Sequence, residues 1–144
     1  MVPLELKLHR WAGYTLTVFF AGHFIATRVG PIVYDLNANT GLLAVPLLRL
    51  PYHIFYVYYC LLGAAGFYHL FYGLPKALKA FGVEVPSAWR PGTTFFRNAS
   101  VIGSTVLISS IFALGGAYFP IQLSQEQRYH EIVAELYAKV GIRK

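Results

Sequence analysis

Residues 52–74 read YHIFYVYYCLLGAAGFYHLFYGL, one of the most apolar stretches of the chain, with Pro51 and Pro75 at its borders. An α-helix rises about 1.5 Å per residue, so roughly 20 apolar residues cross the hydrocarbon core of a bilayer. Backbone polar groups in lipid must be satisfied within the segment, which favours a helix. The stretch therefore predicts a membrane-spanning helix over residues 52–74.

Two further runs have the same character, over residues 8–29 and 99–119, the latter bounded by Asn98 and Pro120. The chain has 144 residues, of which 56% are hydrophobic and 12% charged, and this charged fraction is about half that of a soluble domain. A core of this size cannot hide so many apolar residues. We expect an all-α integral membrane protein with three transmembrane helices, forming a single membrane-anchor domain over residues 1–144.

The segments outside the spans carry their own expectations. Residues 42–50 are apolar but too short to cross a membrane, so we expect them along its interface. Residues 81–98 contain two prolines and two glycines, typical of an irregular loop. Residues 123–140 alternate apolar and charged side chains at helical spacing, as at Ile132 beside Glu131. This pattern predicts an amphipathic C-terminal helix on the membrane surface or against a soluble partner.

The net charge of +6 lies mainly at the ends of the apolar runs rather than on one polar face, which argues against a nucleic-acid partner. With three spans, the N-terminal segment and the second loop share one side of the membrane. The opposite short loop holds Arg28 and Arg49. The positive-inside rule then places the N-terminus in the matrix or the cytoplasm. The basic residues on that side are Lys7, Arg10, Lys76, Lys79, Arg90 and Arg97.

The single cysteine, Cys60, lies within the second apolar run, so it forms neither a disulfide framework nor a thiolate metal site. The chain has no flavin-binding motif and no cysteine cluster for an iron–sulfur centre. We therefore do not expect it to perform dehydrogenation itself. Only a few residues precede the first apolar run, so we also expect no cleavable presequence.

His69 is the most informative residue of the second span. Gly63, Gly66, His69, Gly73 and Lys76 fall within roughly 140° of arc on one helix face. The glycines could leave a flat slot beside a nitrogen ligand, as a porphyrin requires. Lys76 lies two turns beyond His69, about 10 Å along the axis, where it could meet a haem propionate. The same pattern also fits close helix packing with a histidine hydrogen-bonded across helices, and spacing alone leaves both open.

The first span carries two more histidines. His23 lies 14 positions after His9, roughly 21 Å along the helix axis. Because the first two spans are antiparallel, His9 and His69 approach the same leaflet, whereas His23 approaches the other. His69 then takes a second axial ligand from a partner, or each histidine serves a separate haem. For His23 itself, the position favours an interfacial polar residue over a haem ligand.

Arg10 shares a leaflet with His69 and Lys76. It could hold propionates or polarise a quinone carbonyl, although an arginine at the end of a span is most often an interfacial anchor. We expect His53 to be interfacial and His130 to be solvated.

The motif HRxxG at residues 9–13 and the motif YHxxxGL at residues 68–74 resemble the cytochrome b-type membrane anchor of succinate dehydrogenase and fumarate reductase. Three spans in a chain of this length match the larger anchor chain of the one-haem type. The resemblance implies that His69 is an axial ligand of haem b. It also implies that Arg10 contributes to the ubiquinone pocket and that Lys76 approaches the haem propionates.

Some positions depart from that family. Leu6 stands where the family has a quinone-binding serine, Pro75 and Lys76 replace an Arg-His pair, and Ala80 replaces an aspartate. His23 and the LeuProTyr run at residues 50–52 are similar to the two-haem, single-chain version, in which the positions of His23 and His69 ligate different haems. Three spans lack the opposite ligands, which implies a partner anchor chain.

The resemblance implies an anchor subunit of complex II that holds the iron–sulfur and flavoprotein subunits on the mitochondrial or bacterial inner membrane and passes electrons toward ubiquinone. A haem-free accessory or assembly subunit of a respiratory complex is the alternative. A small transporter subunit would need polar groups through the middle of the bilayer, whereas here they gather near the leaflets.

Overall fold

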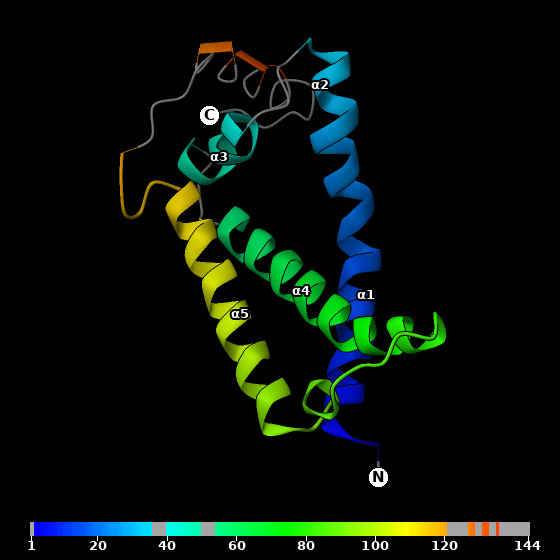
Figure 1. Cartoon of the computed structure of the whole chain (residues 1–144). Helices are drawn as coiled ribbons and strands as arrows, with labels where there is room; N and C mark the ends of the chain where they lie inside the picture. Colours follow the sequence, from blue (N-terminus) through cyan, green and yellow to red (C-terminus); the bar gives the residue numbers. More distant parts are fainter. Residues whose placement is uncertain are drawn as a thin grey trace.

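The computed structural model describes residues 2–35, 40–49, 54–120, 127–128, 131–132 and 135. Within these residues the chain is helical and has no strand, and three helices are long and apolar enough to cross a membrane: Leu4–Val33, Ile54–Ala80 and Thr94–Leu114. The predicted all-α fold with three candidate spans is thus confirmed. Helix α4 (Ile54–Ala80) lies between α1 (Leu4–Phe24) and α5 (Thr94–Leu114) and packs against both (Figure 1).

The first span is longer at both ends than the predicted 8–29. Helix α1 continues through a π-helical segment, Ile25–Val29, into the short helix α2, Gly30–Val33. The N–H of Gly30 donates to the carbonyl of Ile25, which is the wide turn of a π-helix. Pro31 follows and has no N–H to continue the α-helical ladder, which accounts for the local widening.

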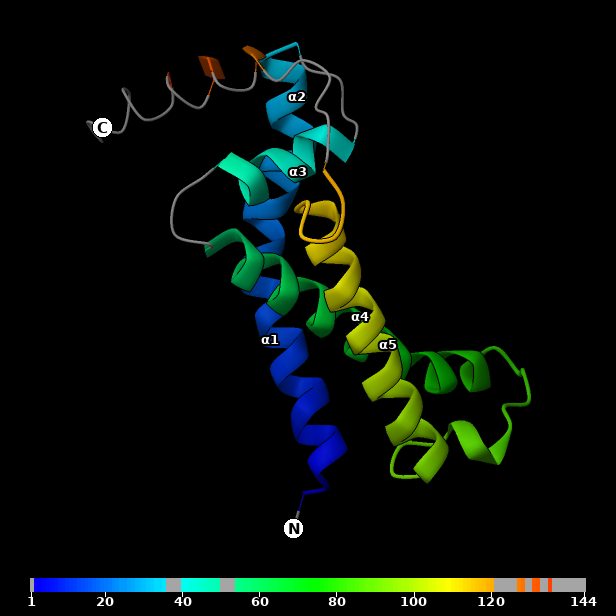
Figure 2. The ribbon, with the colours of Figure 1, turned by 90° about the vertical axis from the view of Figure 1, so that its left-hand side faces the viewer.

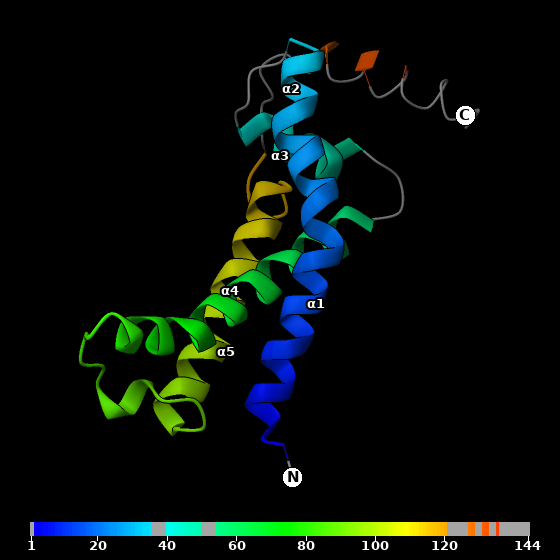
Figure 3. The same ribbon diagram turned by 90° about the vertical axis from the view of Figure 1, so that its right-hand side faces the viewer.

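The predicted range of 52–74 ends the second span just before Pro75, but the helix continues beyond this residue. Helix α4 runs on to Ala80, with Pro75 buried inside it. Pro75 cannot donate to the carbonyl one turn earlier, and such a proline commonly kinks a helix. Figures 2 and 3 both show α4 changing direction near its C-terminal end. Residues 52 and 53, at the predicted start, lie outside the described residues.

The third span begins and ends earlier than the predicted 99–119. The side chain of Thr93 accepts a hydrogen bond of 3.2 Å from the Phe96 N–H, which caps the start of α5. After Leu114, Gly116 has a φ of 77°, and the N–H groups of Gly116 and Ala117 bond back to carbonyls of the last turn. This is a Schellman motif, which ends the helix while the sequence is still apolar.

The segments between the spans are more structured than predicted. Residues 40–49 form helix α3 (Thr40–Arg49), which packs against α4 and α5 and buries Ala44, Val45 and Leu47. Residues 81–93 are irregular, as predicted, apart from the 3-10 helix Ser87–Trp89. In Figure 1 this loop lies at the same end of the bundle as the N-terminus, and α3 lies at the opposite end.

The C-terminal tail is described only in part. Its described residues are helical, with Ile132 buried and the polar ones exposed, as expected of an amphipathic helix. Arg128 pairs with Glu131 at 3.3 Å. The rest of the predicted helix over 123–140, together with residues 121–122 and 141–144, lies outside the described residues.

A cluster of aromatic rings around Phe96 lies between α4 and α5. This side chain is only 1% exposed and stacks on Phe71 with ring centroids 5.0 Å apart. Tyr68 and Tyr72 meet it edge-on, at 6.1 Å and 6.2 Å. Edge-to-face and offset-stacked rings are the favoured aromatic geometries. Phe96 therefore joins α5 to the part of α4 that carries His69.

We expect Phe96→Ala to lower the free energy of unfolding by about 3–5 kcal/mol, the usual cost of emptying a buried phenylalanine site. The measurement is denaturant-induced unfolding of the purified protein in detergent, followed by circular dichroism. Phe95→Ala is the matched control, because Phe95 is its neighbour in α5 but is 48% exposed. Equal destabilisation by the two substitutions would contradict the role assigned to Phe96.

Candidate functional site

The imidazole of His69 faces α1 and lies directly on His9. The two ring centroids are 4.1 Å apart with an interplanar angle of 18°. The Nδ1 atom of His69 is 3.3 Å from the carbonyl oxygen of His9. A carbonyl only accepts, so we assign the ring proton to Nδ1. No described residue makes a hydrogen bond to Nε2 of His69, and this nitrogen keeps a lone pair for a ligand.

A glycine on α1 allows this close approach. A Cβ atom at Gly13 would lie 3.2 Å from Cε1 and 3.4 Å from Nδ1 of His69. The glycines on the His69 face of α4 have different neighbours. Gly63 faces Leu107 of α5, and Gly66 and Gly73 face Leu16 and His9 of α1. Side chains of α1 and α5 therefore occupy the space in which a flat slot was expected, and the His9 ring lies against the imidazole.

We expect Gly13→Val to push His69 off α1 and to lower the free energy of unfolding by about 1–3 kcal/mol, as overpacking does. Gly22→Val is the matched control in the same helix, because a Cβ atom at Gly22 meets nothing within 4 Å. Thermal unfolding of both variants in detergent measures the difference. If Gly13→Val is no less stable than Gly22→Val, the contact between residue 13 and His69 does not limit the size of the side chain at this position.

The stack continues beyond the two histidines. His9 also lies on Tyr72, with ring centroids 4.4 Å apart, and the Nζ atom of Lys76 is 4.3 Å from the centroid of the Tyr72 ring. The Nδ1 atom of His9 is buried and has no hydrogen-bond partner among the described residues. A buried polar atom without a hydrogen-bond partner is costly, by roughly 1–3 kcal/mol. His9 is thus held by its neighbours with one polar atom unsatisfied.

A cavity opens beside this stack on the outer surface of the α1–α4 pair. Its volume is about 460 Å³, within the range of about 300–1,000 Å³ common for small-molecule sites. The cavity brings together three residues that the sequence singled out, His9, Arg10 and His69. Lys76 does not line it, contrary to the idea that Lys76 and His69 face one slot. The full lining is His9, Arg10, Gly13, Tyr14, Leu16, Thr17 and His69.

Tyr14 and Thr17 were not among the predicted site residues. They follow Arg10 at helical spacing, so that all three line the same side of α1. The Thr17 hydroxyl donates to the carbonyl of Gly13 at 3.0 Å. Among the described residues, the Tyr14 hydroxyl, the Arg10 guanidinium and the ring N–H of His9 are then the cavity's donors without a hydrogen-bond partner. The i, i+4 and i+7 spacing from Arg10 is the signal that could have found them.

His23 lies away from this cavity, as its position in the sequence predicted. Its ring is near Tyr58 and Tyr59, with centroids 6.4 Å and 6.3 Å away. The hydroxyl of Thr27 donates to its backbone carbonyl at 2.7 Å. The structure therefore does not bring His23 and His69 to one site. His53 and His130 lie outside the described residues.

Hydrogen bonds near the N-terminal end of α1 connect this helix to α4 and α5 beside the site. Arg97 of α5 donates to Oε1 of Glu5 through Nη2 at 3.0 Å and through Nε at 3.2 Å. The Tyr68 hydroxyl, next to His69, donates to the carbonyl of Glu5 at 3.3 Å. These bonds tie α1 to both other long helices one turn before His9.

The residues of the cavity fit one axial ligand of a haem. His69 is oriented through Nδ1, as metal-bound histidines usually are, and its other nitrogen is free. His9 lies parallel to His69 rather than opposite it, so it is not placed as the second ligand.

His9, Arg10 and His69, which line the cavity, also belong to the two motifs that resemble the complex II anchor. Gly13, the glycine of the first motif, is the one that His69 packs against. Comparison of the chain with protein-family models, with curated proteins and with solved structures finds no match.

Proposed function

We propose that this chain is a membrane anchor subunit of a succinate:quinone oxidoreductase, respiratory complex II. It would bind haem b together with a second anchor chain and help to form the ubiquinone-reduction site. The observation that carries the proposal is the arrangement of His69. Its Nδ1 is held by the His9 carbonyl, its Nε2 has no partner among the described residues, and Arg10 lines the same cavity.

His69 would serve as the axial ligand through Nε2. The His9 carbonyl keeps the Nδ1 proton in place and so holds the lone pair on the ligating nitrogen. Haem b, when bound, supplies a one-electron centre whose potential depends on its axial ligands and their surroundings. Gly13 keeps His69 close to α1, and Phe96 anchors the neighbouring turns of α4.

Arg10 would orient ubiquinone at the mouth of the cavity. Its guanidinium donates hydrogen bonds and stays charged, so it stabilises negative charge that develops on a quinone oxygen during reduction. The Tyr14 hydroxyl offers a second donor at the same mouth. Leu6 cannot replace the hydroxyl that the family uses one turn before the arginine. We therefore assign the quinone contact to Arg10 and Tyr14, with His9 beside them.

The partners follow from what this chain leaves open. A second anchor chain would close the cavity and provide the other axial ligand, while iron–sulfur and flavoprotein subunits would supply the redox centres that this sequence lacks. Large apolar side chains of α1 are exposed along its length, among them Trp11, Val18 and Phe20, and would contact lipid or that anchor. The basic residues near the N-terminal end of the bundle support an orientation with that end in the matrix or the bacterial cytoplasm.

The test is co-purification through an affinity tag on this chain, extracted from its own membrane in mild detergent. We expect flavin fluorescence and succinate-dependent reduction of a soluble dye to follow the tag in stoichiometric amount. A tagged chain that carries neither would refute the assignment to complex II. The dye accepts electrons without the quinone site, so this test is independent of the haem.

One observation favours a second function, a haem-free accessory or assembly subunit. His69, His9, Tyr72 and Lys76 form a continuous stack that already occupies the His69 face. In such a subunit the histidines would only pack helices. The two functions differ in one measurable property: only the anchor predicts a haem that depends on His69, whereas an accessory or assembly subunit of a respiratory complex predicts none.

A further inference from the structure

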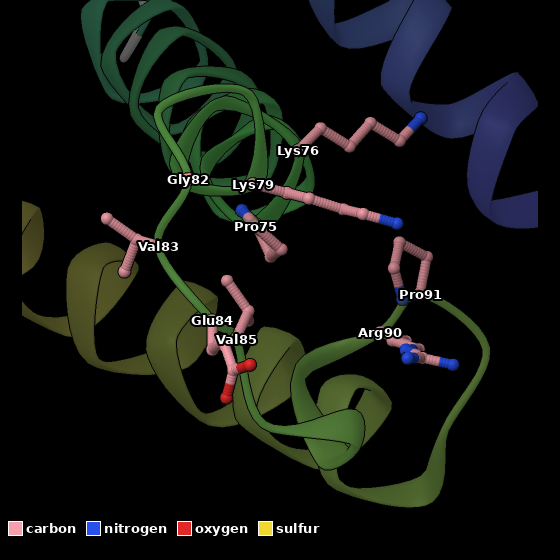
Figure 4. A pocket seen from close by; sticks show the side chains of 9 residues that line it. All are labelled: Pro75, Lys76, Lys79, Gly82, Val83, Glu84, Val85, Arg90 and Pro91. Carbon is pink, nitrogen blue, oxygen red and sulfur yellow. The ribbon is translucent and has the colours of Figure 1, made fainter.

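A second cavity lies at the end of α4, away from His69. It has a volume of about 780 Å³ and lies between the last turns of α4 and the segment that leads to α5. Three cationic side chains line it, Lys76, Lys79 and Arg90, with Pro75 and Pro91 forming apolar walls. Figure 4 shows the Lys79 side chain extending over Pro91 on the side of Arg90.

The positive charge of this cavity is not compensated within the described part of the chain. Neither Lys79 nor Arg90 has an ion-pair partner there, and Lys76 rests on the ring of Tyr72. Glu84 is the one acidic residue of the lining, and in Figure 4 its carboxylate lies in the left half of the view, whereas the ends of the three cationic side chains lie in the right half. Three cations and one carboxylate leave the lining with an excess of positive charge, so this cavity favours an anion.

The position of the cavity indicates what carries that anion. It lies beyond Pro75, where α4 bends at the end of a candidate span. Phe81, which follows α4 directly, is 84% exposed, and the nearby Val83 is also exposed. Exposed apolar side chains beside a basic cavity at a span end match the boundary between acyl chains and headgroups. An anion attached to an acyl chain would satisfy both features.

We propose that this cavity binds the phosphate of an anionic phospholipid headgroup. Arg90 presents a planar fork suited to phosphate oxygens, and Lys79 adds a point charge from α4. Basic pockets beside membrane helices on the positive side recognise such headgroups. The inference goes beyond the proposed function and does not depend on haem or quinone. It concerns residues other than those of the His69 cavity.

The test is native mass spectrometry of the full-length protein purified in mild detergent. It is titrated with phosphatidylglycerol or with phosphatidylcholine of the same acyl chains, and the dissociation constant of the first bound lipid is measured. Each cation near a membrane surface strengthens binding of anionic lipid by about fivefold. We therefore expect Lys79→Gln/Arg90→Gln to weaken the binding of phosphatidylglycerol by up to about 25-fold. The binding of phosphatidylcholine should not change.

Lys7→Gln/Arg28→Gln is the matched control, because it removes the same charge from residues outside this cavity. Lys79→Arg/Arg90→Lys keeps both positive charges and should keep the preference for phosphatidylglycerol. This result would show that the Gln variant loses the preference through lost charge and not through a disturbed fold. Equal preference in the Gln variant and the control would overturn the proposal. Inorganic phosphate is titrated alone in a second arm. If it binds as tightly as the lipid and depends on Lys79 and Arg90, the ligand is free phosphate and the lipid assignment is wrong.

Discussion

Replacing His69 should remove the haem while the protein still assembles. We expect the haem-to-flavin ratio of the purified complex to fall by more than tenfold in His69→Ala, because the nearest other imidazole, His9, is stacked between His69 and Tyr72 and does not face the position of the lost nitrogen. His69→Gln is the sharper variant: its amide can still donate to the His9 carbonyl and fill the space beside Gly13. Helix packing is then kept, and only the imidazole nitrogen is lost.

The matched control for this experiment is Leu70→Ala, the next residue of α4, whose side chain is 64% exposed. It should leave the haem-to-flavin ratio unchanged. The haem is measured as its pyridine adduct and the flavin by fluorescence after proteolysis. A wild-type ratio in both His69 variants would show that another residue ligates the iron and would contradict the assignment of His69.

Replacing Arg10 should impair quinone reduction without affecting succinate oxidation. A hydrogen bond from a charged donor is worth about 1.5–3 kcal/mol. We therefore expect Arg10→Gln to lower kcat/KM for a soluble ubiquinone analogue by about 10- to 100-fold. Succinate-dependent reduction of a dye that accepts electrons before the quinone site should stay at the wild-type level, because the flavin and iron–sulfur centres are elsewhere.

Lys7→Gln is the control for Arg10, since Lys7 is an exposed basic residue of the same helix that does not line the cavity. It should keep wild-type kinetics with both acceptors. Equal losses in Lys7→Gln and Arg10→Gln would show that the effect does not depend on a contact in the cavity, and would contradict the role assigned to Arg10. A parallel loss of dye reduction in Arg10→Gln would show that the change disturbs assembly.

The three spans could be predicted from the sequence because hydrophobic length is a direct requirement of the bilayer. Their ends could not, because helix ends depend on local bonds. The Thr93 cap starts α5 before its most apolar part, and the left-handed Gly116 stops it early. Pro75 borders the predicted span and was expected to end or kink its helix; it lies inside α4, because a proline can bend a packed helix without ending it.

The composition of the site was only partly predictable. The antiparallel order of the first two spans was enough to expect His9 and His69 at one level, and the structure places their rings together. It was not enough to show that the rings stack, because stacking depends on how far each helix rotates about its own axis. The same rotation decides that Lys76 lies on Tyr72 and lines the second cavity.

The dithionite-reduced minus oxidised spectrum of the wild-type complex, purified through a tag on this chain, shows directly whether His69 belongs to a haem site. We expect the α-band of a b-type haem, at about one haem per flavin if the partner anchor supplies only the opposite ligand. A complex that co-purifies with flavin and shows no α-band would contradict it. His69, His9 and Tyr72 would then be a packing stack of a haem-free subunit.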